Sequence, residues 1–491
     1  MKVALIIPPS PFLLDERVFP SLGILRVAAS LEQAGHHVDL LDLSGVSNYL
    51  EVVSRYCWTH IVDAFGITST TPQFPSVVKI MRTLREFSTA RIILGGPHVT
   101  LTNAADKMER KRGISGRGRL ALESMTTLYD DRVLVAGDGE IAIHHALRTD
   151  ACGIIDADDL NSEMFMSDEF YDATPEPARH LIDMRSYHYT VEGKEASSLI
   201  SQLGCPFGCG FCGGRSSRTF RVTRTRTTEK IVSELRHMYE AYGYTGFMCY
   251  DDELNVSPAM VELMNAITDL QMELGVEFRL RGFIKAELFT SVQAEAMRRA
   301  GFRWILTGFE GAHPRILENI NKKATVDDNT RCVETAKDAG LKVKALMSIG
   351  HPGESEETVR SVEDWLIKME PDDFDCTVIT TYPGTPYYDM AEHVKYDIWA
   401  YKAKSGDVLY SYDLDYATTA DYYKGMPGKY KAYVFTDYLT SEDLVRLRDD
   451  LEKSVRAKLN IPFNPSRASV QFEHSMGQGI PGWILRTTET Q

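Results

Sequence analysis

The feature that most constrains the fold of this chain is a repeated alternation of short, β-branched strand patterns with helical patterns. A helix between two strands is the crossover that parallel pairing requires, so this order predicts parallel sheets covered by helices. The repeats form two groups, separated by a segment rich in charge and proline. We therefore predict an α/β protein with domains at 1–151 and 195–392, an extended linker at 152–194 and an extension at 393–491.

The first group predicts a five-stranded, doubly wound, Rossmann-like domain. Strands are expected at 3–7, 38–43, 61–67, 91–94 and 133–136, with helices at 22–34, 75–87 and 140–148. Ligands of such sheets lie beyond the carboxyl ends of the strands, where the loops 68–71, 95–100 and 137–140 are rich in Gly, Ser or Thr. Each loop alone also fits an ordinary capped turn. Neither a G-x-G-x-x-G nor a G-x-x-x-x-G-K-S/T pattern follows the first strand, which disfavours nicotinamide and nucleoside triphosphates.

The second group contains a C-x-x-x-C-x-x-C pattern formed by Cys205, Cys209 and Cys212, with Phe211 before the last cysteine. Three thiolates on a glycine-rich loop suit a cubic iron–sulfur cluster, and a missing fourth ligand leaves one iron open to a chelating molecule. Two alternatives are a zinc site and three structural cysteines. Zinc would need a fourth ligand at short spacing, and His188, His237 and Cys249 are not in that relation.

This pattern resembles that of the radical S-adenosylmethionine (SAM) superfamily. The resemblance implies one [4Fe–4S] cluster, SAM bound to its open iron, and a partial (β/α)6 barrel. Barrel strands are expected at 197–202, 246–250, 276–280, 304–308, 343–349 and 376–380, with helices at 228–242, 258–274, 291–300, 326–339 and 356–369. Functional loops of such barrels lie at the carboxyl ends of the strands.

The resemblance also assigns SAM-binding roles to residues at these strand ends. They are Phe211, Asp252, Glu253, Arg281 (expected to end the third strand), Glu310 and Tyr382. Two positions depart from the family pattern: Gly311 stands where serine is usual after Glu310, and His351 replaces an apolar residue in the G-x-P-G-E turn. Each charged residue alone could equally serve a surface ion pair.

The strand-end loops of the first domain resemble those of the cobalamin-binding domain that precedes the catalytic domain in many radical SAM enzymes. The resemblance assigns cobalamin binding to Ser69, Thr70, Gly95, Gly96, His98, Gly137 and Glu140. The Asp-x-His-x-x-Gly signature of the methionine-synthase type of cobalamin domain is absent, so no histidine is predicted as the lower cobalt ligand. The basic stretch at 107–119 is expected to be a solvated loop.

The remaining sequence bounds the function further. The formal net charge is −15, which disfavours a nucleic-acid partner. No apolar run is long enough to span a membrane and no signal-peptide pattern follows Met1, so we predict a cytoplasmic protein. The extension is expected to be mainly helical, with a helix at 441–459 capped by Thr440 or Ser441. Its many tyrosines are expected to pack it against the barrel or to line a substrate cavity.

The combined resemblance implies a cobalamin-dependent radical SAM enzyme. The expected reaction is C-methylation of an unactivated carbon in a small metabolite or biosynthetic intermediate, through a 5′-deoxyadenosyl radical and methylcobalamin. The expected partners are this substrate and an electron donor of flavodoxin or ferredoxin type. Cyclisation or rearrangement without methylation stays an alternative. A non-catalytic cobalamin or cluster sensor is a further one, although no segment offers a signalling module.

Overall fold

Six parallel strands form the sheet of the first domain, in the order β2-β1-β3-β4-β5-β6. The computed structural model describes residues 1–13, 16–114, 116–127, 132–423 and 430–461. The strands are β1 Lys2–Ile7, β2 His37–Asp42, β3 Ala64–Thr68, β4 Arg91–Gly95, β5 Arg132–Ala136 and β6 Gly153–Asp156. The order reverses beside β1, so the sheet is doubly wound, as predicted, and its strand ends open a crevice there.

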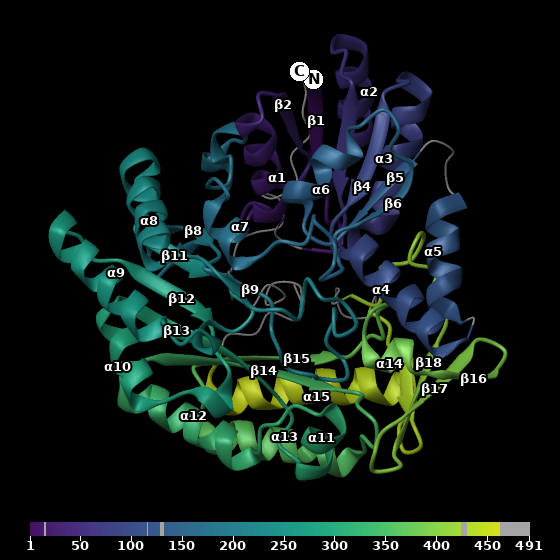
Figure 1. The fold of residues 1–491 in the computed structure, drawn as a ribbon. Helices are drawn as coiled ribbons and strands as arrows, with labels where there is room; N and C mark the ends of the chain where they lie inside the picture. Colours follow the sequence, from purple (N-terminus) through teal and green to yellow (C-terminus); the bar gives the residue numbers. More distant parts are fainter. Residues whose placement is uncertain (14–15, 115, 128–131, 424–429, 462–491) are drawn as a thin grey trace.

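Helices cover both faces of this sheet (Figure 1). They are α1 Leu22–Gln33, α2 Tyr49–Thr59, α3 Phe74–Phe87, α4 Pro97–Arg112, α5 Arg117–Thr127 and α6 Gly139–Ala146. Alternate residues of each strand serve opposite faces: Val3 and Leu5 join the core under α1 and α6, while Ala4 and Ile6 join the core under α3. The strands are apolar on both faces because both faces are buried.

The segment 152–194 is not the extended linker that its charge and proline content predict. Its first residues form β6, which pairs in parallel with β5. Helix α7 (Asp168–Ala173) and strand β7 (Thr190–Val191) follow, and β7 adds an antiparallel strand to the second sheet. This segment is therefore built into both domains.

Six parallel strands form the barrel, in the order β15-β14-β13-β12-β11-β8. They are β8 Lys194–Leu199, β11 Gly246–Cys249, β12 Arg279–Phe283, β13 Phe302–Glu310, β14 Lys342–Ile349 and β15 Asp373–Val378. Strands β8 and β15 do not pair, so the sheet is a curled half-barrel. Its outer helices are α8 Thr228–Tyr242, α9 Met260–Leu274, α10 Ser291–Arg299, α11 Pro314–Ile320, α12 Val326–Asp338 and α13 Glu356–Met369. Figure 1 shows the first domain above this half-barrel.

Side chains alternate between the two faces of the barrel sheet. Phe247, Leu280 and Ile305 belong to the large apolar core beneath the outer helices, whereas Met248 and Leu306 belong to a small cluster that includes Val18 and Tyr189. Val18 precedes α1 of the first domain and Tyr189 precedes β7. Segments from outside the barrel therefore fill part of its interior.

The extension differs from the mainly helical prediction. It contains helix α14 (Pro386–Asp389) and a four-stranded antiparallel sheet of β16 Glu392–Lys395, β17 Ile398–Lys402, β18 Val408–Tyr412 and β19 Val434–Thr436. Helix α15 (Ser441–Leu459) has the predicted bounds, and Thr440 caps it together with Asp443. The tyrosines hold the extension to the first domain as well, since Tyr388, Tyr416 and Tyr422 join the core around α3 and α4.

The basic stretch at 107–119 is not a solvated loop, because it forms the end of α4 and the start of α5. The Arg117 side chain is 4% exposed. Its guanidinium lies 3.9 Å from the centre of the Tyr388 ring and donates to Ser411 Oγ at 3.2 Å. The extension therefore pairs with this charge and keeps it from solvent.

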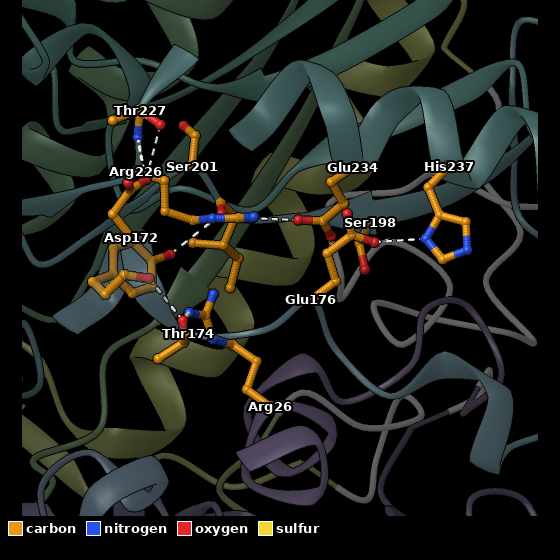
Figure 2. Close-up of polar contacts among 12 residues, drawn as sticks. Arg26, Asp172, Thr174, Glu176, Ser198, Ser201, Arg226, Thr227, Glu234 and His237 are labelled. Atoms are coloured by element: carbon orange, nitrogen blue, oxygen red, sulfur yellow. Dashed lines mark hydrogen bonds and ion pairs between the residues drawn. The ribbon is translucent and has the colours of Figure 1, made fainter. Parts of the chain in front are cut away.

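A buried polar network joins the segment after α7 to the barrel (Figure 2). Glu234 of α8 accepts from Arg226 on one oxygen and from Arg179 on the other, the latter at 2.6 Å. Arg26 of α1 donates to Thr174 and pairs with Glu140 at 3.2 Å. These contacts fix the first domain relative to the barrel.

Among the described residues, no helix is both long and apolar enough to cross a bilayer.

Candidate functional site

The three cysteines lie on a loop between the short strands β9 (Gln202–Leu203) and β10 (Arg224–Thr225), here called the cluster loop. Backbone hydrogen bonds hold this loop from several sides. Cys205 N–H donates to Phe220 O at 3.0 Å, and Gly210 N–H donates to Ile320 O at 2.7 Å. Tyr387 N–H in turn donates to Gly210 O at 3.1 Å. A Cβ atom at Gly210 would overlap the Tyr387 ring, so only glycine lets the loop approach so closely.

The electrostatics of the loop suit a bound iron–sulfur cluster. Burial raises the pKa of all three thiols, that of Cys212 to about 12, so without metal they are protonated. Lys322 and Lys285 counteract this effect at Cys209, as Arg215 does at the other two. Arg215 also donates to Cys205 O at 2.6 Å. Buried cations around three thiols fit a group that carries several thiolates.

The same residues do not fit the zinc alternative. Among the described residues, no three His, Cys, Asp or Glu side chains converge on a point where a single metal ion would lie. Zinc in proteins needs such convergence, usually of four ligands. A cubic cluster binds a different iron to each thiolate and therefore does not need it.

The acidic residues after β11 separate into different environments. Asp251 is buried and its Oδ1 accepts from Ser201 N at 3.0 Å and Gln202 N at 2.6 Å, so it holds the start of the cluster loop. Asp252 is exposed and Glu253 is half-buried. Burial raises the pKa of Glu253 to about 7, against the attraction of Lys322 and Lys285. Asp252 and Glu253 are thus the groups of this run that a ligand could reach.

Arg281 lies elsewhere than the sequence predicts. It is in the middle of β12 rather than at its end, is 5% exposed, and donates to Tyr189 Oη at 2.7 Å. Its guanidinium also lies 5.5 Å from the centre of the Trp304 ring. The prediction that Arg281 ends the third strand is wrong because that strand begins and ends three residues later than its apolar pattern indicates.

A cavity of about 320 Å³, here called the barrel cavity, opens at the ends of β13, β14 and β15. It brings together three of the predicted residues: Phe211, Glu310 and Tyr382. Glu310 Oε2 accepts from Ser348 Oγ at 2.7 Å, and its Oε1 lies 3.7 Å from Lys322 Nζ. Ser348 and Lys322 were not predicted. Ser348 is near a strand end and could have been found there, but Lys322 follows α11 and carries no such signal.

A second cavity, here called the strand-end cavity, measures about 230 Å³ and lies at the carboxyl ends of the first sheet. Predicted residues Gly95, Gly96, Gly137 and Glu140 line it. Thr68, Thr100 and Asp138 line it as well; they belong to the predicted ligand loops, although no binding role was assigned to them. A Cβ at Gly96, where φ is +93°, would lie 2.6 Å from Thr68 Oγ1 and 2.7 Å from Ser69 N. Only glycine therefore lets this loop pack so closely against the loop after β3.

The other three predicted cobalamin residues are not among the lining residues of this cavity. Ser69 is buried, and Thr70 is exposed and caps the turn that follows it. His98 packs against the rings of Phe74 and Tyr416, at 4.3 and 6.3 Å between ring centres. Burial lowers the pKa of His98 to about 3, so its imidazole is neutral. His98 thus joins the first domain to the extension.

The segment with Thr219 and Phe220 lies on the same loop as the three cysteines and also forms a wall of the strand-end cavity. Thr219 and Phe220 line the cavity together with Ile200 and Leu203. Phe220 O accepts from Cys205 N–H, and Thr219 N–H donates to Asp158 Oδ1 at 2.7 Å. The loop that carries the three cysteines therefore adjoins the strand-end cavity.

Comparison with known families agrees with both sites. The radical SAM superfamily model matches residues 199–366, and the B12 binding domain model matches residues 16–125. Together the two matches span more than half of the chain and include the cluster loop and strands β2, β3 and β4 of the first sheet.

The chain is similar to several methyltransferases over most of its length. An uncharacterized methyltransferase of Pyrococcus horikoshii is 26% identical over 80% of this chain and 83% of its own. The hopanoid C-3 methylase of Methylococcus capsulatus is 25% identical over 77% and 70%. The radical SAM methyltransferase TsrM of Kitasatospora setae, solved with cobalamin and a [4Fe-4S] cluster, has a similar fold, with a TM-score of 0.59 and 17% identity over 82% and 81%. With a B12-binding domain ahead of a radical SAM domain, this chain belongs to the cobalamin-dependent radical SAM enzymes.

Proposed function

We propose that this enzyme is a C-methyltransferase that acts on an unactivated carbon of a small molecule. The observation that supports it most is that Thr219 and Phe220, which follow the cysteines on the same loop, line the strand-end cavity, so that ligands of the two sites would lie close together. The methyltransferases among the relatives point to the same reaction.

When bound, the cluster with SAM supplies a hydrogen-abstracting radical, and cobalamin supplies a transferable methyl group. Cys205, Cys209 and Cys212 would hold the cluster, and Arg215 would balance its charge. Phe211, Glu310 and Tyr382 of the barrel cavity, together with Asp252 and Glu253, would bind SAM. Arg281 would pair with the SAM carboxylate, although it lies deeper in the barrel.

Residues of the first domain would hold cobalamin. Gly95, Gly96, Gly137 and Glu140 line the strand-end cavity, which has room for one arm of a large ligand. Ser69 and Thr70 would act from the loop after β3, and His98 from the first turn of α4. Four tyrosines line the barrel cavity and would exclude water from the radical: Tyr382 of the barrel, and Tyr422, Tyr423 and Tyr430 of the extension.

The test uses SAM with a deuterated methyl group, anaerobic enzyme with both cofactors, and a flavodoxin- or ferredoxin-type reductant as the proposed partner. We expect a product in which CD3 replaces one hydrogen, with one S-adenosylhomocysteine and one 5′-deoxyadenosine for each product formed. The substrate hydrogen should appear in the 5′-deoxyadenosine. A product that loses hydrogen without gaining CD3 would instead establish cyclisation or rearrangement, and a complete lack of SAM cleavage would indicate a sensor.

A further inference from the structure

Four side chains form one line of hydrogen bonds that ends in the barrel cavity. Tyr387 Oη lies 3.4 Å from His351 Nδ1, and His351 Nε2 lies 2.8 Å from Ser348 Oγ. Ser348 Oγ lies 2.7 Å from Glu310 Oε2. Tyr387 and His351 are fully buried and Ser348 is 4% exposed, while Ser348 and Glu310 line the cavity. The line therefore runs from behind the cluster loop to a carboxylate that a ligand can reach.

The chemistry of the four groups fixes the direction of donation. Glu310 faces the Lys322 ammonium and accepts from the Ser348 hydroxyl, which uses the single proton of that hydroxyl. Burial, and then Lys322, lower the pKa of His351 to about 3, so its ring is neutral and donates through one nitrogen only. Its Nε2–H must donate to Ser348 Oγ, and Nδ1 accepts from the Tyr387 hydroxyl.

The backbone also holds Glu310 in an unusual conformation. Its φ is +66°, a region that non-glycine residues rarely occupy. The turn is closed by Gly311 N–H, which donates to Phe309 O at 2.8 Å, and the pairing of β13 with β14 shifts register there. Backbone strain of this kind persists where surrounding contacts enforce it, and it is frequent at ligand sites. Here Ser348 and Lys322 hold the two oxygens of the carboxylate.

We propose that His351, acting through Ser348, is a positioning residue that fixes the Glu310 carboxylate for the ammonium or ribose hydroxyls of SAM. This inference rests on the proposed function, because it takes SAM as the ligand of Glu310. It also explains why a polar ring stands where the family pattern has an apolar residue: a leucine would fill the space but donate nothing to Ser348.

Paired variants distinguish the hydrogen bond that His351 donates to Ser348 from the packing of the His351 side chain. His351→Leu fills the site without a donor, whereas His351→Gln places an amide N–H near the position of Nε2. Ser348→Ala removes the middle link. Ser361→Ala is the control, since its hydroxyl lies on α13 and donates to Glu357 O of the same helix. Each variant is reconstituted to the iron content of the wild type before SAM is added.

The readouts are the SAM dissociation constant and the change that SAM causes in the EPR spectrum of the reduced cluster. We expect about tenfold weaker SAM binding for His351→Leu and Ser348→Ala, the cost of one hydrogen bond to a charged group. His351→Gln and Ser361→Ala should stay within about twofold of the wild type by the same relation.

The possible outcomes each decide the inference. Wild-type affinity in Ser348→Ala and His351→Leu would overturn it, and so would equal losses in His351→Gln and His351→Leu, which would indicate packing alone. Iron-replete wild-type protein whose cluster spectrum does not respond to SAM would overturn the proposed function, and the positioning role with it.

Discussion

Replacing Cys205, Cys209 or Cys212 with alanine is expected to reduce 5′-deoxyadenosine formation from SAM to the level of iron-free protein. In the proposed site each thiolate would bind one iron of the cluster, and the nearest other cysteines in the sequence are Cys152 and Cys249. An incomplete cluster provides neither a stable open iron nor an electron for the sulfonium. The loss should therefore be complete rather than graded.

The control for this experiment is Cys152→Ala, since Cys152 is exposed and distant in sequence from the loop. That variant should retain wild-type iron content and SAM cleavage. Folding is checked for all four variants by circular dichroism of the metal-free proteins. Sustained 5′-deoxyadenosine formation in any variant of the three loop cysteines would refute the cluster assignment.

The second large effect is expected at the buried network of Figure 2, where Glu234→Gln should destabilise the protein by about 3 kcal/mol or more. Glu234 is 1% exposed and lies between Arg179 and Arg226, which are 3% and 6% exposed. A neutral amide would leave two buried guanidinium groups without a counter-charge. For a chain of 491 residues, we expect the midpoint of thermal unfolding, followed by circular dichroism, to fall by about 3 °C.

Glu273→Gln is the matched control, because Glu273 also pairs with an arginine, Arg236, but on the surface. Exposed pairs contribute little, so its midpoint should change by less than about 2 °C. Equal midpoints for Glu234→Gln and the wild type would show that the network does not stabilise the fold.

The effect of Glu234 should also depend on pH. Burial alone would raise the pKa of Glu234, but Arg179 and Arg226 lower it overall. A carboxylate with a lowered pKa in the folded state adds stability above its unfolded pKa, and that stability is lost as the pH falls through the folded value. The difference between the wild type and Glu234→Gln should therefore be full at neutral pH and shrink in acid.

The sequence predicts those parts of the fold whose signals are local. Helix α15 is an example, since a capping box at Thr440 and Asp443 marks its start and an apolar stripe defines its length. Strand β6 was missed because it has only four residues, and its pairing with β5 decides its structure. The extension sheet was missed because β16 is exposed throughout and shows no alternation of apolar and polar residues.

In the candidate site, too, residues marked by local sequence patterns could be predicted, and residues placed by tertiary packing could not. The cysteine spacing locates the cluster loop directly, and the strand-end rule locates Glu310 and the cavity glycines. Lys322 and Phe220 could not be predicted, because Lys322 reaches Glu310 from the end of a helix and Phe220 reaches the first domain across the domain boundary. Such contacts depend on tertiary packing that no local pattern encodes.

The central claim is that one chain holds both an iron–sulfur cluster and cobalamin. Its most direct test is the iron, sulfide and cobalt content per chain after anaerobic purification from cells supplied with cobalamin. The two sites predict about four irons, about four sulfides and about one cobalt. Iron without cobalt would contradict the cobalamin role of the strand-end cavity, and cobalt without iron would overturn the radical SAM chemistry itself.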